Sequence, residues 1–305
     1  MIKRVIDISE QAYLHQLHQQ LVIDKNGKTV AQIPIEDLGV LILQHPAIVI
    51  TQAVVISCQQ NNAAIVFCDA RHLPYSVLLP ISDGNSLHSK IIRQQISLSL
   101  PAKKRVWQQI VKHKISGQAQ VLKHVGKNAV ALERLADNVK TGDPENLEAQ
   151  AAQKYWRLLF GDGFRRDTDA TQGTSAEGIN SLLNYGYGIM RAMVARAIVA
   201  SGLHPALGVQ HSNQYDGLCL ADDVMEPFRP WVDLRVYQLS QRYPALEVNQ
   251  TTKQPFLKLL SESVCWNQQT MPLMVASHYL MADIKRAFDD KNQKINYPEW
   301  GELLL

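Results

Sequence analysis

The 305-residue chain is 46% hydrophobic and 19% charged, a globular composition that excludes a disordered or fibrous protein. Its longest apolar runs, such as 189–200, are short or interrupted by arginines, so we expect no membrane-spanning segment and no signal peptide. Four widely spaced cysteines form no disulfide or metal-ligand pattern, which favours a reduced, cytoplasmic location.

The net charge of +3 is unevenly distributed along the chain. Residues 90–140 contain 11 Lys and Arg against Glu133 and Asp137, a local charge of +9, which leaves −6 for the remainder. Such a basic block is either a polyanion-binding surface or a solvated helical face.

The first 85 residues have the pattern of a small β-rich domain. Short apolar and β-branched runs predict strands over 5–8, 13–15, 21–23, 40–43, 47–51 and 64–68. Asn26-Gly27 is typical of a tight hairpin turn. Short helices are predicted over 35–40 and 54–61, and the turn-rich segment 80–85 marks the expected domain boundary.

From about residue 89 the apolar residues recur at helical spacing, as at Val106, Ile110 and Ile115. We therefore predict an α+β protein. A small N-terminal β-rich domain (1–85) is followed by a larger all-α domain (86–305), which contains every candidate for chemistry below.

One candidate is Glu148, in a helix predicted to begin near Asp143. Asp143 suits the capping position, Pro144 the first turn, and Glu145 the positive end of the helix dipole. Glu148 falls on the apolar stripe of this helix, and an inward carboxylate needs a partner. It is therefore either a salt-bridge or cap element, or a ligand.

A second candidate is a polar stripe on the helix predicted over 178–201. Its members, spaced at i, i+4, i+7 and i+11, are Asn180, Asn184, Tyr187 and Arg191. They either orient a carboxylate or contact phosphates, or they line an interface with another helix. Gly186 and Gly188 cost so long a helix stability, which indicates close packing there.

The third candidate is His211, which precedes an apolar run ending in the acids Asp222, Asp223 and Glu226. Prolines 227 and 230 argue against one continuous helix, so a new helix is predicted to start near Glu226 or Asp222. A lone histidine is usually structural, whereas one near clustered acids is a metal-site candidate.

Together these segments resemble the Cas-one family of CRISPR-associated integrases, closest to members from systems with a single large effector nuclease. The resemblance rests on Glu148 in Leu-Glu-Ala-Gln-Ala-Ala, on 178–187, and above all on 207–233, and it covers the whole chain. It implies that Glu148, His211 and Glu226 hold a catalytic divalent metal. Asp222 and Asp223 are alternatives for the third ligand, but the Glu-Pro context of Glu226 fits the family better.

This donor set suits Mn²⁺ or Mg²⁺, while zinc remains open on ligand count alone. The resemblance implies attack by the 3′-hydroxyl of a DNA fragment on a phosphodiester of the CRISPR repeat, inserting spacer DNA, with associated endonuclease activity. Residues expected to contact DNA or support the site are Lys103, Lys104, Arg105, Arg165, Arg166, Asn184 and Tyr187.

The implied partners are double-stranded DNA, a second copy bound through the β domain, a dimer of the small Cas-two protein and, as a further candidate, the effector nuclease. Two other functions stay open: a structure-specific nuclease on branched DNA, and a non-catalytic DNA-binding scaffold. A hydrolase of small phosphate esters is disfavoured by the basic block.

Overall fold

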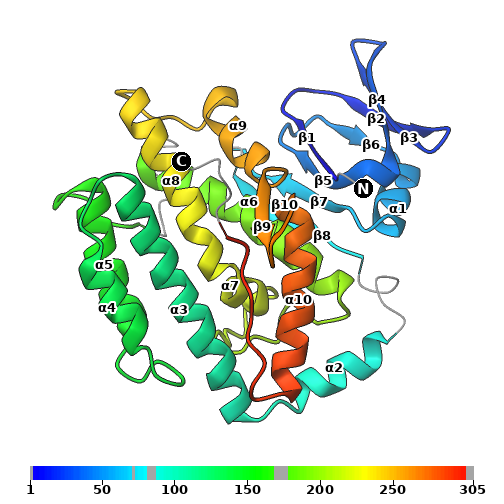
Figure 1. The fold of residues 1–305 in the computed structure, drawn as a ribbon. Coiled ribbons are helices and arrows are strands. Elements are labelled where there is room, and N and C mark those ends of the chain that lie inside the picture. The colour runs from blue at the N-terminus through cyan, green and yellow to red at the C-terminus, as the bar shows by residue number, and fades with distance from the viewer. Residues whose placement is uncertain (1–2, 71–72, 81–86, 168–177, 300–305) are drawn as a thin grey trace.

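Two four-stranded sheets form the N-terminal part of the protein (Figure 1). The structure, a computed structural model, describes residues 3–70, 73–80, 87–167 and 178–299. In one sheet β2 (Tyr13–Leu17), β3 (Gln20–Lys25) and β4 (Lys28–Pro34) are antiparallel, and β6 (Val49–Ile50) runs parallel to β2. Asn26 and Gly27 have φ angles of 51° and 74° between β3 and β4, which confirms the predicted hairpin turn.

The second sheet has the order β1-β5-β7-β8. Its strands β1 (Arg4–Ile8), β5 (Leu38–Leu43) and β7 (Ala64–Cys68) are parallel, and β8 (Pro74–Leu78) is antiparallel to β7. All of β5 is buried, because its alternate side chains serve two cores. Leu41 and Leu43 pack between the sheets, whereas Val40 and Ile42 pack against the helices. Burial on both faces explains the uninterrupted apolar run in the sequence.

The predicted strands all coincide with observed ones, although 47–51 shrinks to the two residues of β6. Strands β4 and β8 were not predicted, since β4 is mostly exposed and polar and β8 begins with a proline. The helix α1 (Gln52–Gln60) confirms the one predicted at 54–61. The helix predicted over 35–40 is wrong beyond the short turn η1 (Ile35–Asp37), because β5 begins at Leu38 and pairs with β1. The expected boundary near residue 85 lies outside the described residues.

The remainder of the described chain is mostly helical, which confirms the predicted α+β order. Its helices are α2 (His88–Ile96), α3 (Leu100–His124), α4 (Val130–Asn138), α5 (Leu147–Phe160), α6 (Ile179–Ala200), α7 (Cys219–Met225), η2 (Glu226–Phe228), α8 (Arg229–Arg242), α9 (Gln250–Leu259) and α10 (Leu273–Asp289). A hairpin of β9 (Ser263–Trp266) and β10 (Gln269–Pro272) is an addition to the all-α region that we expected. No helix in the described ranges is both long and apolar enough to span a bilayer.

The buried helix α6 organises this region and contacts α7, α8, α9, α10 and the strands β7 and β8 (Figure 1). A Cβ on Gly186 would lie 2.5 Å from Val232, and one on Gly188 would lie 2.8 Å from Pro74. The predicted close packing at both glycines is therefore confirmed. The helices α3, α4 and α5 pack together, and α3 also contacts η2 and α8. Helix α3 therefore lies between α5, which contains Glu148, and η2, which contains Glu226.

Candidate active site

Glu148 lies in the first turn of α5, but the helix does not begin where the sequence indicated. Asn146, with φ at 52°, precedes the first helical residue, Leu147, and its side chain makes no capping bond. Asp143 instead accepts the backbone N–H groups of Leu147 and Glu148, at 2.9 and 3.0 Å. The prediction that Asp143 caps this helix is therefore confirmed, whereas the prediction that the helix begins near Asp143 with Pro144 in its first turn is wrong. Asp143 and Asn146 both have left-handed backbone angles, and the turn that contains them lets the Asp143 side chain reach the N-terminus of α5.

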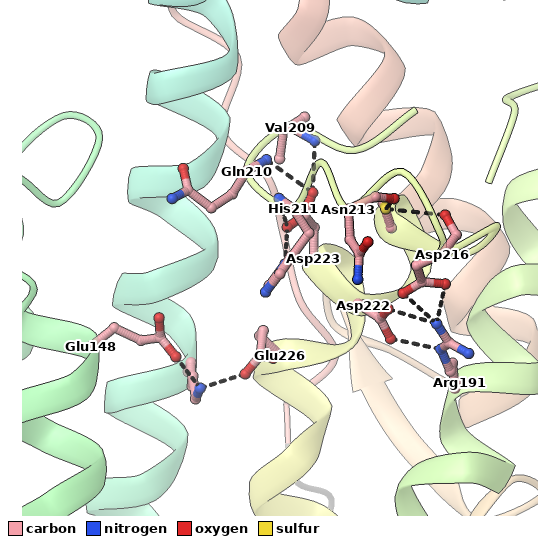
Figure 2. A network of polar contacts seen from close by, with 12 residues as sticks. Glu148, Arg191, Val209, Gln210, His211, Asn213, Asp216, Asp222, Asp223 and Glu226 are labelled. Carbon is pink, nitrogen blue, oxygen red and sulfur yellow. Dashed lines mark hydrogen bonds and ion pairs between the residues drawn. The ribbon is translucent and has the colours of Figure 1, made fainter. Parts of the chain in front are cut away.

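The carboxylates of Glu148 and Glu226 face each other across α3 (Figure 2). The Lys114 ammonium on α3 contacts both, through Oε1 of Glu148 and Oε2 of Glu226. Glu226 is only 4% exposed, and its other oxygen, Oε1, accepts the Nε–H of Arg229 at 2.8 Å. Glu226 Oε2 is buried, and it makes no hydrogen bond of regular geometry with any described residue despite its contact with the ammonium.

Mutual attraction keeps the buried Glu226 and Lys114 charged. Burial by itself raises the pKa of Glu226, but the adjacent Arg229 and Lys114 outweigh it and hold that pKa below its ordinary value. Burial lowers the pKa of Lys114, and the two glutamates reverse the shift, so its pKa is raised. The cluster is thus a pair of carboxylates closed around a cation.

His211 is positioned by one buried carboxylate, that of Asp223. Asp223 Oδ2 accepts the backbone N–H groups of Val209 at 2.6 Å and Gln210 at 3.0 Å. Its Oδ1 accepts the His211 backbone N–H at 3.1 Å and the imidazole Nδ1–H at 2.6 Å. A carboxylate can only accept, so Nδ1 is the donor, and in the neutral ring Nε2 then keeps its lone pair, which is the arrangement of a metal-ligating histidine with a carboxylate behind it. The same hydrogen bond raises the pKa of His211. In Figure 2 the ring points from its loop toward the side where Glu148 and Glu226 lie.

The remaining acids of this neighbourhood are engaged elsewhere. Arg191 of α6 donates to both oxygens of Asp222, at 2.6 and 2.7 Å, and to both oxygens of Asp216, at 2.7 and 2.9 Å. This clamp connects the loop of His211 to α6. With Asp222 held by Arg191 and Asp223 by the loop, Glu226 is the acid that faces Glu148.

The donor chemistry of Glu148, His211 and Glu226 fits a divalent cation, because two carboxylates already surround a positive charge and an imidazole lone pair is free beside them. Among the described residues, however, no three His, Cys, Asp or Glu side chains are close enough together to form a metal-binding group as they stand. The Lys114 ammonium lies between the carboxylates of Glu148 and Glu226.

Asn184 and Tyr187, from the predicted polar stripe, contact the guanidinium groups of Arg166 and Arg229. Arg166 donates to Asn184 Oδ1 at 2.5 Å and lies 5.3 Å from the centre of the Tyr187 ring. Arg229 lies 4.5 Å from the same ring, and the Tyr187 hydroxyl donates to the buried Asp233. Burial raises the pKa of Asp233 to about 7. Both stripe residues therefore hold guanidinium groups in place.

Lys103, Lys104 and Arg105, here named the basic triplet, lie on the first turns of α3 and are half-buried or exposed. They precede Lys114 by about 14–17 Å along the helix axis at 1.5 Å per residue. Other members of the basic block are used internally. Lys127 donates to the carbonyl groups of Leu158 and Leu159 at the end of α5, at 2.6 and 3.0 Å.

Comparison with known proteins identifies the family. A family model described as CRISPR associated protein Cas1 matches residues 6–256. The chain belongs to the Cas1 family. It is 33% identical over 303 residues to the CRISPR-associated endonuclease Cas1 of Neisseria meningitidis serogroup C (strain 8013), covering 98% of this chain and 97% of the relative.

Solved structures share the Cas1 fold of this chain. A casposase bound to an integration product matches with a TM-score of 0.80 and 17% identity, over 99% of this chain and 95% of the casposase. A chain of a Cas6-RT-Cas1–Cas2 complex matches with a TM-score of 0.74 and 16% identity, over 98% of this chain and 36% of that one. The suggested resemblance and the fold are thus confirmed.

Several site residues were missed by sequence reasoning. Lys114 was counted with the surface charges of the basic block, although its position four residues after the buried Ile110 and eight after Val106 indicated an inward side chain. Asp223 was considered only as a rival ligand, and its role as the acceptor of the His211 loop had no sequence signal. Arg229 was also missed, although its spacing of three residues from Glu226 is that of a helical ion pair.

Proposed function

We propose that this Cas1-family chain is a divalent-metal-dependent integrase that inserts spacer DNA into a CRISPR array and has associated DNA endonuclease activity. One observation supports it above all. Carboxylates from two separate elements close on a single cationic position, and the imidazole of His211, with its Nε2 lone pair free, comes from a third.

Glu148, His211 and Glu226 would hold the metal, which we expect to be Mn²⁺ or Mg²⁺. Two carboxylates suit either ion, and the imidazole favours Mn²⁺. The chemistry that such an ion supplies when bound is to lower the pKa of an attacking hydroxyl and to neutralise the phosphate under attack.

The chain's own residues supply orientation and charge. Asp223 keeps the proton on Nδ1 of His211, and Arg229 keeps Glu226 ionised and fixed in direction. In strand transfer, a 3′-hydroxyl attacks a repeat phosphodiester, one phosphorus–oxygen bond forms as another breaks, and the displaced 3′-oxygen takes up a proton. The bonds balance, so no energy-rich cofactor is required.

DNA affinity would come from cations around this site. The basic triplet, Arg165 and Arg166 would neutralise phosphates, with Asn184 and Tyr187 supporting Arg166. We propose double-stranded DNA, a second copy of the chain and a small Cas-two dimer as partners, with the effector nuclease as a further candidate. Two similarities support these partners. A casposase bound to an integration product supports double-stranded DNA, and a chain of a Cas6-RT-Cas1–Cas2 complex supports the Cas-two dimer. We expect the assembly to act in the cytoplasm.

The test is an integration assay with the protein, its small partner, Mn²⁺, a short duplex and a supercoiled plasmid carrying the repeat. We expect the duplex to be joined to nicked plasmid by the wild type, and not by Glu148→Ala or His211→Ala, which should still bind DNA. Joining at the wild-type rate by both variants would show that the metal site is misassigned. Loss of binding together with activity would show that these residues serve structure.

A further inference from the structure

Lys114 occupies an unusual place for a member of a basic block. Of the 11 Lys and Arg in 90–140 it is the buried one, with 7% of its surface exposed. The middle of α3 places its ammonium between α5 and η2, in contact with one oxygen of Glu148 and one of Glu226. These are the carboxylates to which we assign a metal.

We propose that Lys114 is a tethered cation that occupies the metal position in the resting chain, so that a divalent ion binds only by displacing its ammonium. The proposal deepens the proposed function and rests on its assignment of Glu148, His211 and Glu226. It gives Lys114 a positioning role: the residue keeps two ligands in place before metal arrives and sets the concentration of metal required.

Electrostatics explains why such a cation is needed. Glu226 is almost fully buried, and Glu148 keeps a side chain only 27% exposed. Two carboxylates this close, with too little positive charge between them, would repel each other or take up a proton. Arg229 binds only the Oε1 atom of Glu226, so the side of the cluster facing Glu148 depends on Lys114.

Competition follows from the atoms involved. Glu148 Oε1 and Glu226 Oε2 cannot bind the ammonium and a metal ion in the same place at once. Apparent affinity is the intrinsic affinity multiplied by the fraction of molecules with a free site, so an ammonium present in nine molecules of ten weakens binding about tenfold. Removal of the ammonium should therefore tighten metal binding, which is the opposite of what loss of a supporting residue does.

The experiment is a calorimetric titration of metal-free protein with Mn²⁺, for the wild type, Lys114→Met, Lys114→Arg and Glu148→Gln. Lys114→Met keeps the length of the side chain and removes its charge, so we expect Mn²⁺ affinity to rise about tenfold. We also expect its melting temperature in EDTA to fall, and Mn²⁺ to raise it by more than in the wild type. Unchanged or weaker Mn²⁺ binding by folded Lys114→Met overturns the proposal.

Lys114→Arg carries the test if the methionine variant does not fold in EDTA. A guanidinium bridges two carboxylates with more donors than an ammonium, so Mn²⁺ binding should weaken by several-fold. Binding equal to or tighter than in the wild type overturns the proposal. Glu148→Gln distinguishes a failure of the proposed metal site from a failure of the role proposed for Lys114. If it binds Mn²⁺ as well as the wild type, the metal assignment fails; if it does not, and Lys114→Met is no tighter, the role of Lys114 alone fails.

Discussion

Asp223→Asn should disable the site although it replaces none of the three residues proposed to hold the metal. The carboxylate accepts four hydrogen bonds, two at each oxygen: Val209 and Gln210 at Oδ2, and the backbone and Nδ1 of His211 at Oδ1. An asparagine has one acceptor oxygen, so in either orientation its NH₂ group faces two former donors. If that NH₂ group faces the ring, Nδ1 must become the acceptor. The proton then moves to Nε2, the atom needed for metal.

The expected magnitude follows from these bonds. Hydrogen bonds to charged groups contribute about 1.5–3 kcal/mol each, so loss of two amounts to about 3–6 kcal/mol. We expect the lower end for the free energy of unfolding, because the His211 loop is partly exposed and its freed N–H groups can turn to water. Loss of a carboxylate behind a metal-binding histidine typically lowers metal affinity by about 10–100-fold, which we expect for Mn²⁺.

Three measurements check this prediction: calorimetric Mn²⁺ binding, urea unfolding, and long-range ¹⁵N–¹H NMR of the histidine rings, which distinguishes the tautomers. Asp162→Asn is the control for loss of one negative charge, since Asp162 is 84% exposed on its side chain. Wild-type Mn²⁺ affinity in Asp223→Asn, with the proton still on Nδ1, would refute the reasoning.

The same bond makes a prediction about pH. Asp223 raises the pKa of His211 above the ordinary value of 6.5, so the charged ring is favoured in the folded chain. Its contribution to stability is therefore fully present below the unfolded pKa and is lost as pH rises through the folded pKa. In metal-free protein, NMR titration should place the pKa of His211 above 6.5, and Asp223→Asn should lower it.

Three further predictions concern other parts of the chain. Burial beside Arg196 lowers the pKa of His278 to about 4, so the wild type should lose stability relative to His278→Gln as the pH falls from 6.5 to 4. Urea unfolding of both proteins at matched pH should show a loss of at most about 3 kcal/mol. Parallel dependence of the two unfolding free energies on pH would contradict this. Gly186→Ala should destabilise the chain by about 1–3 kcal/mol because its Cβ meets Val232, whereas Gly163→Ala, with open space around it, should change little. Replacement of the basic triplet by glutamines should reduce the slope of log affinity for DNA against log salt by about 2–3, and an unchanged slope would exclude these residues from the DNA path.

The fold was predictable where one local signal dominated. Asn26-Gly27 specifies its turn by backbone conformation alone, and the stripe around Tyr155 makes α5 recognisable in isolation. Prediction failed where a neighbour decided. Residues 38–40 form strand rather than helix because β1 pairs with them, and α5 begins at Leu147, four residues after the Asp143 that caps it.

The sequence by itself determined the order of sheet and helices, since this order depends on the periodicity of apolar residues. Through its resemblance to a family it also indicated Glu148, His211 and Glu226 as candidates. Only the tertiary structure decided what surrounds them. Lys114 is 34 residues from Glu148 and on a different helix from either glutamate, so no local pattern could show it between the two carboxylates. Pairing of buried charges is a property of packing, and packing joins segments that the chain keeps apart.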